Sequence, residues 1–421
     1  MENSFIKKWS FFFASISLTF IWISLQVFNI NLLKSFGFLY DDGYCSNTNL
    51  LSAPHCFGDL LLFIDESLEG NLDDLKHTYS PAVRIIYNIF HNVLLITSGN
   101  TLIILYFCLF IISLTLSWRI VRDRDLNFID FISISLTFAP LLFAIERGNS
   151  IIFMISFMIF WLNALENSNN TKIIFSTILI ICLKTQFILI LIPIIILFGL
   201  RIVVRIVVIL GIINIASIIV LSGDFYQYIL NVFKGFRVLL IYQDGSAEWP
   251  LNMSFQHLVG RIILKSNIDD PYLLIYAKNV FIGLFFIILI FTTFRFKNDK
   301  NHHISIIFLW IVAVIQLNPL SPYYNLVALF PFLFFSFKNI IKTKYYNLNL
   351  DKIIKFTILF NGAIIPIYLD TKLNKIQIEE SSIIYVDNTY TFNLTLIVLL
   401  SIVIYSLNIH RISKAEKIKL F

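Results

Sequence analysis

Charged residues are scarce in this sequence. Asp, Glu, Lys and Arg make up 14% of its 421 residues, whereas 58% of the residues are hydrophobic and 43 are phenylalanine. A typical soluble domain contains about 25% charged residues. No soluble core could bury this much apolar surface, so the composition excludes a soluble globular domain. It indicates one integral membrane domain spanning residues 1–421, because no internal repeat, Gly/Ser linker or separate polar domain interrupts the chain.

Cysteine is also rare, with four residues in the chain. Cys108 and Cys182 lie within apolar runs, which predicts that they are packing residues. Cys45 and Cys56 flank a short polar stretch, where a disulfide and two free thiols fit the sequence equally well. No CxxC or HExxH pattern occurs, and the seven histidines lack the spacing of zinc ligands. We therefore expect no metal site, although the acidic residues that follow Asp41 could bind an ion.

Long apolar runs recur along the chain. A run of about 20 residues crosses a hydrocarbon core of about 30 Å as a helix, which satisfies its own backbone hydrogen bonds. One run, 173–200, is too long for a single span and contains Lys184 and Pro193, so it predicts two short helices, 173–183 and 186–200, that meet at a polar elbow. The sequence thus predicts an all-α bundle of about twelve spans. The runs are 10–30, 101–118, 128–145, 150–165, 173–200, 206–222, 273–293, 303–317, 324–341, 353–369 and 391–409.

Basic residues are distributed unevenly between the flanks of these runs. If the N-terminus is cytoplasmic, the cytoplasmic flanks contain 20 of the 32 Lys and Arg residues. Because Lys and Arg resist translocation, both termini are predicted to be cytoplasmic and the loops 31–100 and 223–272 to lie outside. The run 10–30 lacks a small-residue cleavage site and is expected to remain as the first span. In the first loop, 57–69 and 82–96 have the pattern of amphipathic helices that lie on the membrane surface.

Acidic residues in the first outer loop are candidates for a catalytic base. Asp59 follows a glycine where an amphipathic helix would begin, and the N-terminus of a helix stabilises a carboxylate. Asp42 belongs to a second acidic pair in the same loop. The residues alone favour the plainer interpretation, in which these are helix-start acids on a solvated loop.

A charged turn separates two apolar runs at Glu146-Arg147-Gly148-Asn149. Gly148 can adopt a positive φ, and Asn149 can cap the helix that begins at about Ser150. A charge at the membrane boundary is costly unless it is paired or faces a water-filled cavity, which makes Arg147 a functional candidate. Snorkelling of Arg147 toward the lipid headgroups explains it equally well at this point.

Six short stretches, in order, resemble the motifs of a known family of membrane enzymes. On these stretches the chain resembles the glycosyltransferase C superfamily and, within it, glycosyltransferase family 87, which includes polyprenol-phosphate-mannose-dependent alpha-mannosyltransferases. The chain departs from the family pattern at Gln186 and Phe187 in the elbow, and at Tyr323, Tyr324 and Asn325, where those mannosyltransferases carry histidine. The stretches are FGDLLLFIDESLEGN, TYSPAVRIIYNIF, ERGNSIIFMISF, ICLKTQFILILIP, NMSFQHLVGRI and SPYYNLVALFP.

The resemblance implies transfer of a sugar, mannose or another hexose or pentose, from a polyprenyl-phosphate donor to a glycan or glycolipid acceptor on the outer face of the membrane. It implies that the protein needs no cofactor and binds no nucleic acid, and that membrane lipids are its other partners. Asp59, with Asp42 as the second choice, would act as general base. The donor phosphate would bind Arg147, Lys184 and Arg261, supported by Glu146, Asn149 and Tyr324.

Two other classes of protein fit parts of the same pattern. A lipid-linked glycan flippase or other transporter would carry charged residues buried in the middle of its spans. An O-antigen-type polymerase or ligase would use a lipid-diphosphate donor and arginines in a large outer loop, where this chain has Arg237 and Arg261.

Overall fold

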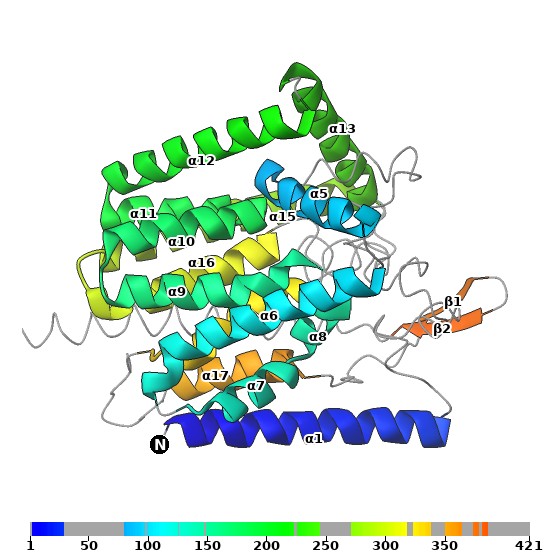
Figure 1. The fold of residues 1–421 in the computed structure, drawn as a ribbon. Helices are drawn as coiled ribbons and strands as arrows, with labels where there is room; N and C mark the ends of the chain where they lie inside the picture. The colour runs from blue at the N-terminus through cyan, green and yellow to red at the C-terminus, as the bar shows by residue number, and fades with distance from the viewer. Residues whose placement is uncertain are drawn as a thin grey trace, which may run out of the picture.

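The computed structural model describes residues 2–28, 80–96, 99–124, 126–146, 149–222, 225–244, 271–317, 323–337, 350–363, 374–378 and 381–385. In this part of the chain, helices lie roughly alongside one another and form a bundle (Figure 1). The α-helices are α1 (Glu2–Phe28), α5 (Pro81–Ile96), α6 (Gly99–Val121), α7 (Phe128–Leu136), α8 (Ala139–Glu146), α9 (Met154–Glu166), α10 (Asn170–Leu183), α11 (Leu191–Phe198), α12 (Leu200–Ser222), α13 (Phe225–Asp244), α15 (Pro271–Phe296), α16 (His303–Leu317) and α17 (Leu350–Asn361).

Short 3₁₀ helices join or extend several of these elements. They are η3 (Arg122–Arg124), η4 (Ser150–Phe153), η5 (Thr185–Ile190), η7 (Lys300–His302) and η8 (Tyr323–Phe334). The predicted all-α class is confirmed for the bulk of the described chain. One small hairpin is added to it, in which β1 (Asn374–Ile378) pairs antiparallel with β2 (Ser381–Tyr385).

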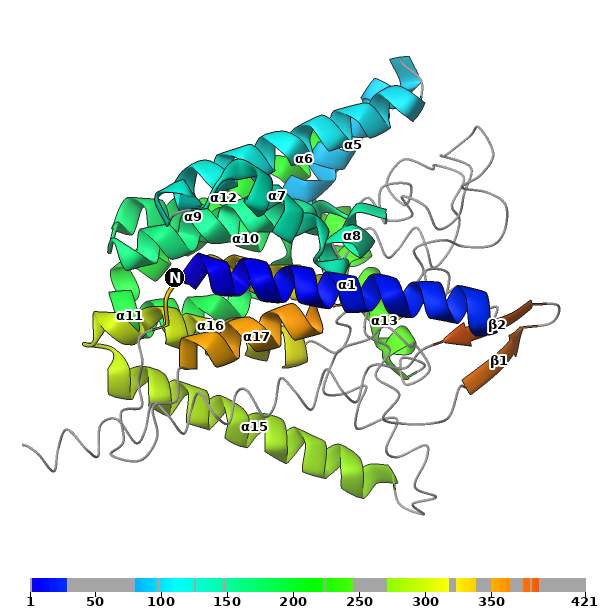
Figure 2. The ribbon, with the colours of Figure 1, turned by 90° about the horizontal axis from the view of Figure 1, so that it is seen from below.

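The bundle has two ends, between which successive long helices run in alternate directions (Figure 1). We refer to the end where α1 begins as the N-terminal end and to the opposite one as the far end. The helices α5 and α13 and the hairpin lie at the far end. Seen from below, α6 and α15 lie on opposite sides of the bundle (Figure 2).

The centre of the bundle is formed by α9, α16 and η8. The helix α9 packs against α6, α10, α16 and η8. Every side chain from His302 to Gln316 is buried, so α16 is covered on all sides. A helix that is apolar all round must be enclosed by protein or by lipid. Here protein encloses it.

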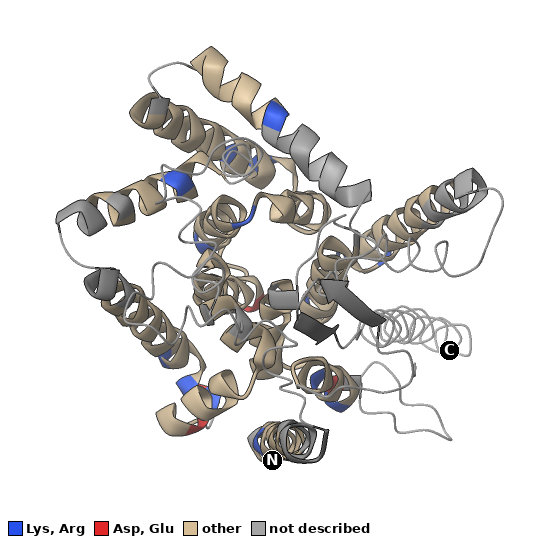
Figure 3. Cartoon of the chain, turned by 90° about the vertical axis from the view of Figure 1, so that its right-hand side faces the viewer, with Lys and Arg blue, Asp and Glu red and all other residues tan. Residues whose placement is uncertain are grey.

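The outer helices show the opposite arrangement, because their apolar side chains face outward. Among the described residues, two helical segments, Ile104–Arg124 and Leu200–Leu221, are long and apolar enough to cross a membrane, and only 33% and 28% of their apolar windows are buried. A core helix of a soluble protein would be mostly buried. Charged residues are few along the described helices when the bundle is viewed from the far end (Figure 3).

Hydroxyl groups join neighbouring helices inside the bundle. Ser117 of α6 donates to Oγ of Ser156 in α9 at 2.7 Å, and Ser156 Oγ donates to the carbonyl of Ser113 at 2.7 Å. The indole of Trp310 in α16 donates to Oγ1 of Thr293 in α15 at 2.9 Å. Small hydroxyl residues allow close helix approach and satisfy each other in an apolar interior.

The predicted elbow in 173–200 is confirmed. The helix α10 ends at Leu183, and η5 begins at Thr185 and continues into α11. Between them, Lys184 has an extended backbone with φ −143° and ψ 105°. The polar residues at this point therefore end one helix and begin the next, as the break in the apolar run predicted.

Some predicted boundaries are wrong. The run 128–145 was expected to be one span, but it is divided into α7 and α8 at Thr137 and Phe138. Pro140 explains the break, because a proline has no N–H to donate to the preceding turn and its ring opposes a continuous helix. The helix α12 begins at Leu200 instead of 206, and α17 ends at Asn361 instead of 369. Cys108 is exposed on the outward face of α6, so its predicted packing role is wrong.

The break between α7 and α8 is held by the end of α17. The backbone N–H of Ala139 donates to the carbonyl of Gly362 at 2.8 Å. The ring of Phe138 lies so close to Gly362 that a methyl group added there would overlap it. Glycine is therefore required at this contact by the close approach of the two segments.

We expect Gly362→Ala to lower the stability of the protein by about 1–3 kcal/mol, the usual cost of overpacking a close contact. The measurement is the midpoint of thermal unfolding of the purified protein in detergent. Gly211→Ala is the matched control, because a methyl group there meets no atom within 4 Å and alanine favours a helix. Equal midpoints for the two variants would show that the Phe138 contact is not restrictive.

Candidate functional site

The residues predicted to form the site fall partly within the described chain. Asn149 and Lys184 have described side chains, and both lie at the far end of the bundle. Glu146 ends α8 and Tyr324 lies in η8, but their side chains are outside the description. The remaining predictions lie outside the described residues and stay predictions. They concern Asp42, Asp59, Arg147, Gly148, Arg261, the pair Cys45 and Cys56, the helix 57–69 and the run 391–409.

Asn149 is completely buried and organises the turn between α8 and α9. Its side-chain Oδ1 accepts from the N–H of Ile151 at 2.9 Å, so its predicted capping role is confirmed for η4. Its own N–H donates to the carbonyl of Ala144 at 2.9 Å. The hydroxyl of Tyr106 in α6 donates to its carbonyl at 3.3 Å. The turn is thus tied to both neighbouring helices.

The helix α5 reaches the same turn through a buried tyrosine. The hydroxyl of Tyr87 accepts from the backbone N–H of Ser150 at 3.2 Å. This N–H lies in the first turn of a helix, where backbone donors lack partners within the helix. The predicted helix 82–96 therefore forms, and it packs against the bundle through α6, α10 and α12.

The start of α5 is bound to the elbow. Ser80 precedes Pro81, and a serine followed by a proline is a strong signal for a helix start. Its Oγ accepts from the N–H of Val83 at 3.3 Å and donates to the carbonyl of Cys182, two residues before Lys184. One hydroxyl group thus caps α5 and joins it to the end of α10.

These contacts bring three distant stretches of the chain together at the far end. Residues 80–87, 149–150 and 182–184 each belong to a different motif on which the family resemblance rests. Their side chains and backbone groups are joined by hydrogen bonds. Lys184, half-buried at the elbow, lies two residues beyond the carbonyl to which Ser80 donates.

A second cation at this end was missed by the sequence analysis. Arg84 of α5 lies over the ring of Tyr228 in α13, with Cζ 5.2 Å from the ring centroid. A guanidinium above an aromatic face is attracted by the ring quadrupole. The contact joins helices from the two long loops. Its only signal in the sequence was a charge in the first turn of an amphipathic helix.

A buried amide was also missed. Gln316, in the last turn of α16, is 4% exposed, and neither atom of its amide has a hydrogen-bond partner within the described chain. Its helix packs against η5 and η8. Burying an amide without a partner costs about 1–3 kcal/mol. The described residues therefore leave the hydrogen-bonding capacity of this amide unused.

Comparison of the chain with protein-family models, with curated proteins and with solved structures finds no match. The family resemblance accordingly rests on the sequence motifs, and three of these meet at the far end of the bundle.

We expect Asn149→Ala to destabilise the protein by about 1 kcal/mol, because the cap of η4 is lost. Asn149→Ser should lose less, since serine also accepts a hydrogen bond at this position. Thermal unfolding in detergent measures both effects. The control is Asn167→Ala, at an exposed asparagine whose side chain bonds within its own turn. An Asn149→Ala variant as stable as Asn167→Ala would contradict the capping role.

Proposed function

We propose that this chain is a multi-pass membrane glycosyltransferase that transfers a sugar from a polyprenyl-phosphate donor to a glycan or glycolipid acceptor at the outer face. One observation carries the proposal. The stretch around Ser80 is bonded to the elbow at Cys182, and Tyr87 of the same stretch is bonded to the turn at Ser150. Three separate motifs of the family resemblance thus share one end of the bundle.

The surface of the bundle supports placement of the chain across a membrane. The outward faces of α6, α12 and α15 are covered by exposed apolar side chains, such as Ile112, Val220 and Ile287. Large exposed apolar surfaces mark sites of contact with a membrane or with another protein. Among the described residues, the two segments that are both long and apolar enough to cross a membrane, Ile104–Arg124 and Leu200–Leu221, belong to this surface. A bundle of about twelve spans agrees with the alternating apolar runs.

The distribution of basic residues supports the proposed orientation. Many of the described Lys and Arg residues lie at the N-terminal end of the bundle, which we assign to the cytoplasm by the positive-inside rule. The far end then faces outward, with both predicted termini inside. The basic residues at the N-terminal end are Lys7, Lys8, Arg119, Arg122, Arg124, Lys172, Arg201, Arg205, Arg295, Lys297, Lys300 and Lys352.

The proposed chemistry is a direct displacement at the sugar. Asp59 takes the proton from an acceptor hydroxyl, because an unassisted hydroxyl is a poor nucleophile. The oxygen attacks the anomeric carbon with inversion, and the bond to the donor phosphate breaks with its electron pair. Charge then develops on the departing polyprenyl phosphate. Cations held in a site of low dielectric constant stabilise it.

Three basic residues are proposed for this task, Arg147, Lys184 and Arg261. An arginine fork can bind two phosphate oxygens at once, and Glu146 would orient it. Lys184 adds a point charge from the elbow, half-buried between α10 and η5. Asn149 supports the arginine by fixing the turn that carries it, through its bonds to Ile151 and Tyr106.

The buried amide of Gln316 is consistent with a ligand rich in hydroxyl groups. An amide donates two hydrogen bonds and accepts two, which matches the hydroxyls of a sugar. Nothing in the described chain uses this capacity. A sugar at the far end would supply hydrogen-bond partners for this amide, whose burial without partners is otherwise unfavourable.

The buried charges do not favour a transporter. Within the described chain, the buried acidic and basic residues, histidines aside, are Asp351 and Lys355. Lys355 Nζ lies 3.0 Å from Asp351 Oδ2, and Asp351 Oδ1 accepts from the N–H of Phe337 at 2.8 Å. Their charges are satisfied by each other and by the backbone, so they form a structural pair.

The alternative of an O-antigen-type polymerase or ligase is distinguished by its lipid-diphosphate donor.

The direct test is sugar transfer by membranes containing the protein, with radiolabelled polyprenyl-phosphate sugars as donors. We expect Asp59→Asn to reduce the rate by about 10² to 10⁴, the usual effect of losing a general base, without weakening donor binding. Arg147→Gln should raise the donor concentration that is needed.

Two controls sharpen this experiment. Asp42→Asn should retain transfer, and loss there with normal transfer by Asp59→Asn would assign the base to Asp42. Transfer from a lipid-diphosphate sugar alone would replace the proposed donor. If the Arg147→Gln variant binds the donor with unchanged affinity, Arg147 does not bind the donor phosphate and instead extends toward the lipid headgroups.

The proposed orientation predicts where reporter fusions are active. A reporter that works only outside the cytoplasm should be active when fused at Asn47 and Gly245 and inactive after Lys344. The physical reason is the retention of basic flanks on the cytoplasmic side. A reporter that fluoresces only in the cytoplasm should give the opposite pattern, with fluorescence after Lys344 and none at Asn47 and Gly245. Activity of the first reporter after Lys344 would reverse the orientation and move the proposed site.

A further inference from the structure

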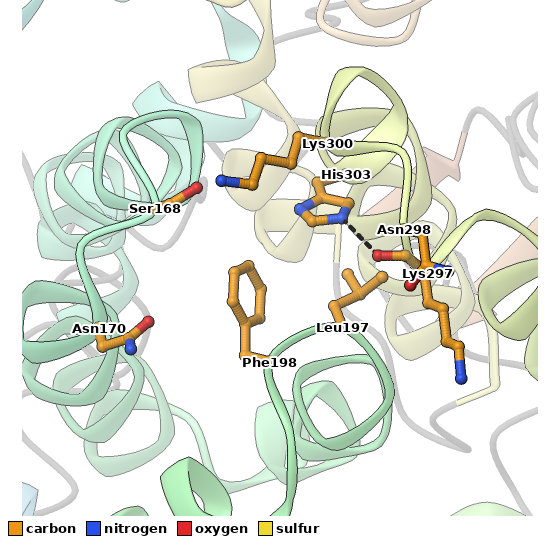
Figure 4. Close-up of a pocket in the computed structure, with 8 residues that line it drawn as sticks. All are labelled: Ser168, Asn170, Leu197, Phe198, Lys297, Asn298, Lys300 and His303. Carbon is orange, nitrogen blue, oxygen red and sulfur yellow. Dashed lines mark hydrogen bonds between the residues drawn. The ribbon is translucent and has the colours of Figure 1, made fainter.

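The N-terminal end of the bundle contains a recess that the proposed reaction does not use. It has a volume of about 490 Å³ and lies where the turn after α9, the end of α11 and the start of α16 meet. Figure 4 shows its lining. Its lining includes Ser168, Asn170, Leu197, Phe198, Lys300 and His303.

The lining of the recess is basic, and one acidic residue, Asp299, lies between two of its lining residues in the sequence, with a carboxylate oxygen 3.4 Å from Nε2 of His302. The lining includes Lys297 and Lys300, and none of the described lining residues is acidic. Two helices begin at the recess, α10 at Asn170 and α16 at His303. The N-terminus of a helix carries partial positive charge and backbone N–H donors, so both favour an anion.

Two polar side chains are directed toward the recess. The Nζ atom of Lys300 and the hydroxyl of Ser168 point toward its open centre, whereas the side chain of Lys297 points away (Figure 4). Ser168 has a φ of 51°, a left-handed conformation fixed by the tight turn between α9 and α10.

His303 is the buried polar group at this site. Its side chain is 5% exposed, and Nε2 lies 3.1 Å from the carbonyl oxygen of Lys297. Because a carbonyl only accepts, Nε2 carries the hydrogen atom. The other nitrogen, Nδ1, is buried and meets no hydrogen-bond partner among the residues that the structure describes. In Figure 4 this nitrogen is on the side of the ring that faces the recess.

One wall of the recess is apolar. Leu197 and Phe198, at the end of α11, form it, and the ring of Phe198 meets the ring of His303 edge to face at 5.4 Å between centroids. A small soluble anion would gain nothing from this wall. A molecule with a phosphate group joined to an acyl chain would use both the cations and the wall.

We propose that this recess binds the phosphate group of an anionic phospholipid. Lys300 and Ser168 contact the phosphate oxygens, and Phe198 and Leu197 contact the start of an acyl chain. Nδ1 of His303, which carries a lone pair and no hydrogen, accepts from a hydroxyl group of the headgroup rather than from the phosphate. Basic pockets between helices at the cytoplasmic surface suit anionic headgroups. The inference depends on the membrane placement proposed above but not on sugar transfer, so each can fail without the other.

The test uses the full-length protein in detergent with phosphatidylglycerol as the probe. A ligand that binds the folded state raises the midpoint of thermal unfolding, by an amount that increases with the ratio of its concentration to its Kd. Phosphatidylglycerol should raise the midpoint more than phosphatidylcholine at equal concentration. Lys300→Gln should weaken the apparent affinity about tenfold, the effect of losing one charge-assisted hydrogen bond. Lys300→Arg should retain most of it.

Two lysines at the same end serve as matched controls. Lys297→Gln removes a charge from the neighbouring turn, but its side chain points away from the recess, so its effect should stay within about twofold. Lys8→Gln removes an exposed charge from α1. Equal losses in all three glutamine variants, or equal effects of the two lipids, would overturn the proposal and leave only general surface charge.

Two further arms complete the design. Inorganic phosphate that raises the midpoint as far as phosphatidylglycerol does would assign the recess to a soluble anion and overturn the lipid. Photoreactive phosphatidylglycerol with the reactive group on its acyl chain gives a measurement on the unmodified protein, even if Lys300→Gln does not fold. Its crosslinks should map to Leu197 or Phe198, and crosslinks confined to other helices would contradict the site.

Discussion

The far end of the bundle depends on the buried turn at Asn149. This residue caps η4, bonds back to α8 and accepts from Tyr106 of α6, while the next N–H is taken by Tyr87 of α5. Each bond is buried, where an unmet polar group is most costly. The turn therefore fixes the positions of four helical elements. Of the three residues proposed to bind the donor, Lys184 lies at the elbow to which α5 is bonded, and Arg147 precedes Asn149 by two positions in the sequence.

The surface of this bundle is apolar, as its interior is. Its outer helices expose isoleucine, valine and phenylalanine, whereas hydroxyl groups such as Ser117, Ser156 and Thr293 meet inside. In an apolar solvent, apolar side chains gain little by moving inward. Small residues that pack closely and polar groups that satisfy each other then hold the helices together. This physical logic connects the composition of the chain to its packing.

The two ends have different chemical characters, and each matches one proposal. At the far end, neutral hydrogen bonds join the motifs, and the buried amide of Gln316 has no hydrogen-bond partner within the described chain. At the N-terminal end, two lysines line the recess at His303, and two helices begin beside it. Sugar transfer and lipid binding would thus occupy opposite surfaces of the same bundle. Neither site requires residues of the other.

Local features of the fold followed from the sequence alone. The scarcity of charge and the length of the apolar runs predicted helices, Lys184 marked the elbow, and Asn149 was identified as a cap, because each depends on the residue itself and its nearest neighbours. Pro140 indicates the break between α7 and α8, but the run 128–145 was interpreted as one span because its length suits a membrane. The exposure of Cys108 could not be predicted, since it depends on which face of α6 meets α9. The bonds from Ser80 to Cys182 and from Tyr87 to Ser150 join residues far apart in the chain. Only the packing of α5 against the bundle decided them, because long-range contacts depend on how complete helices fit together.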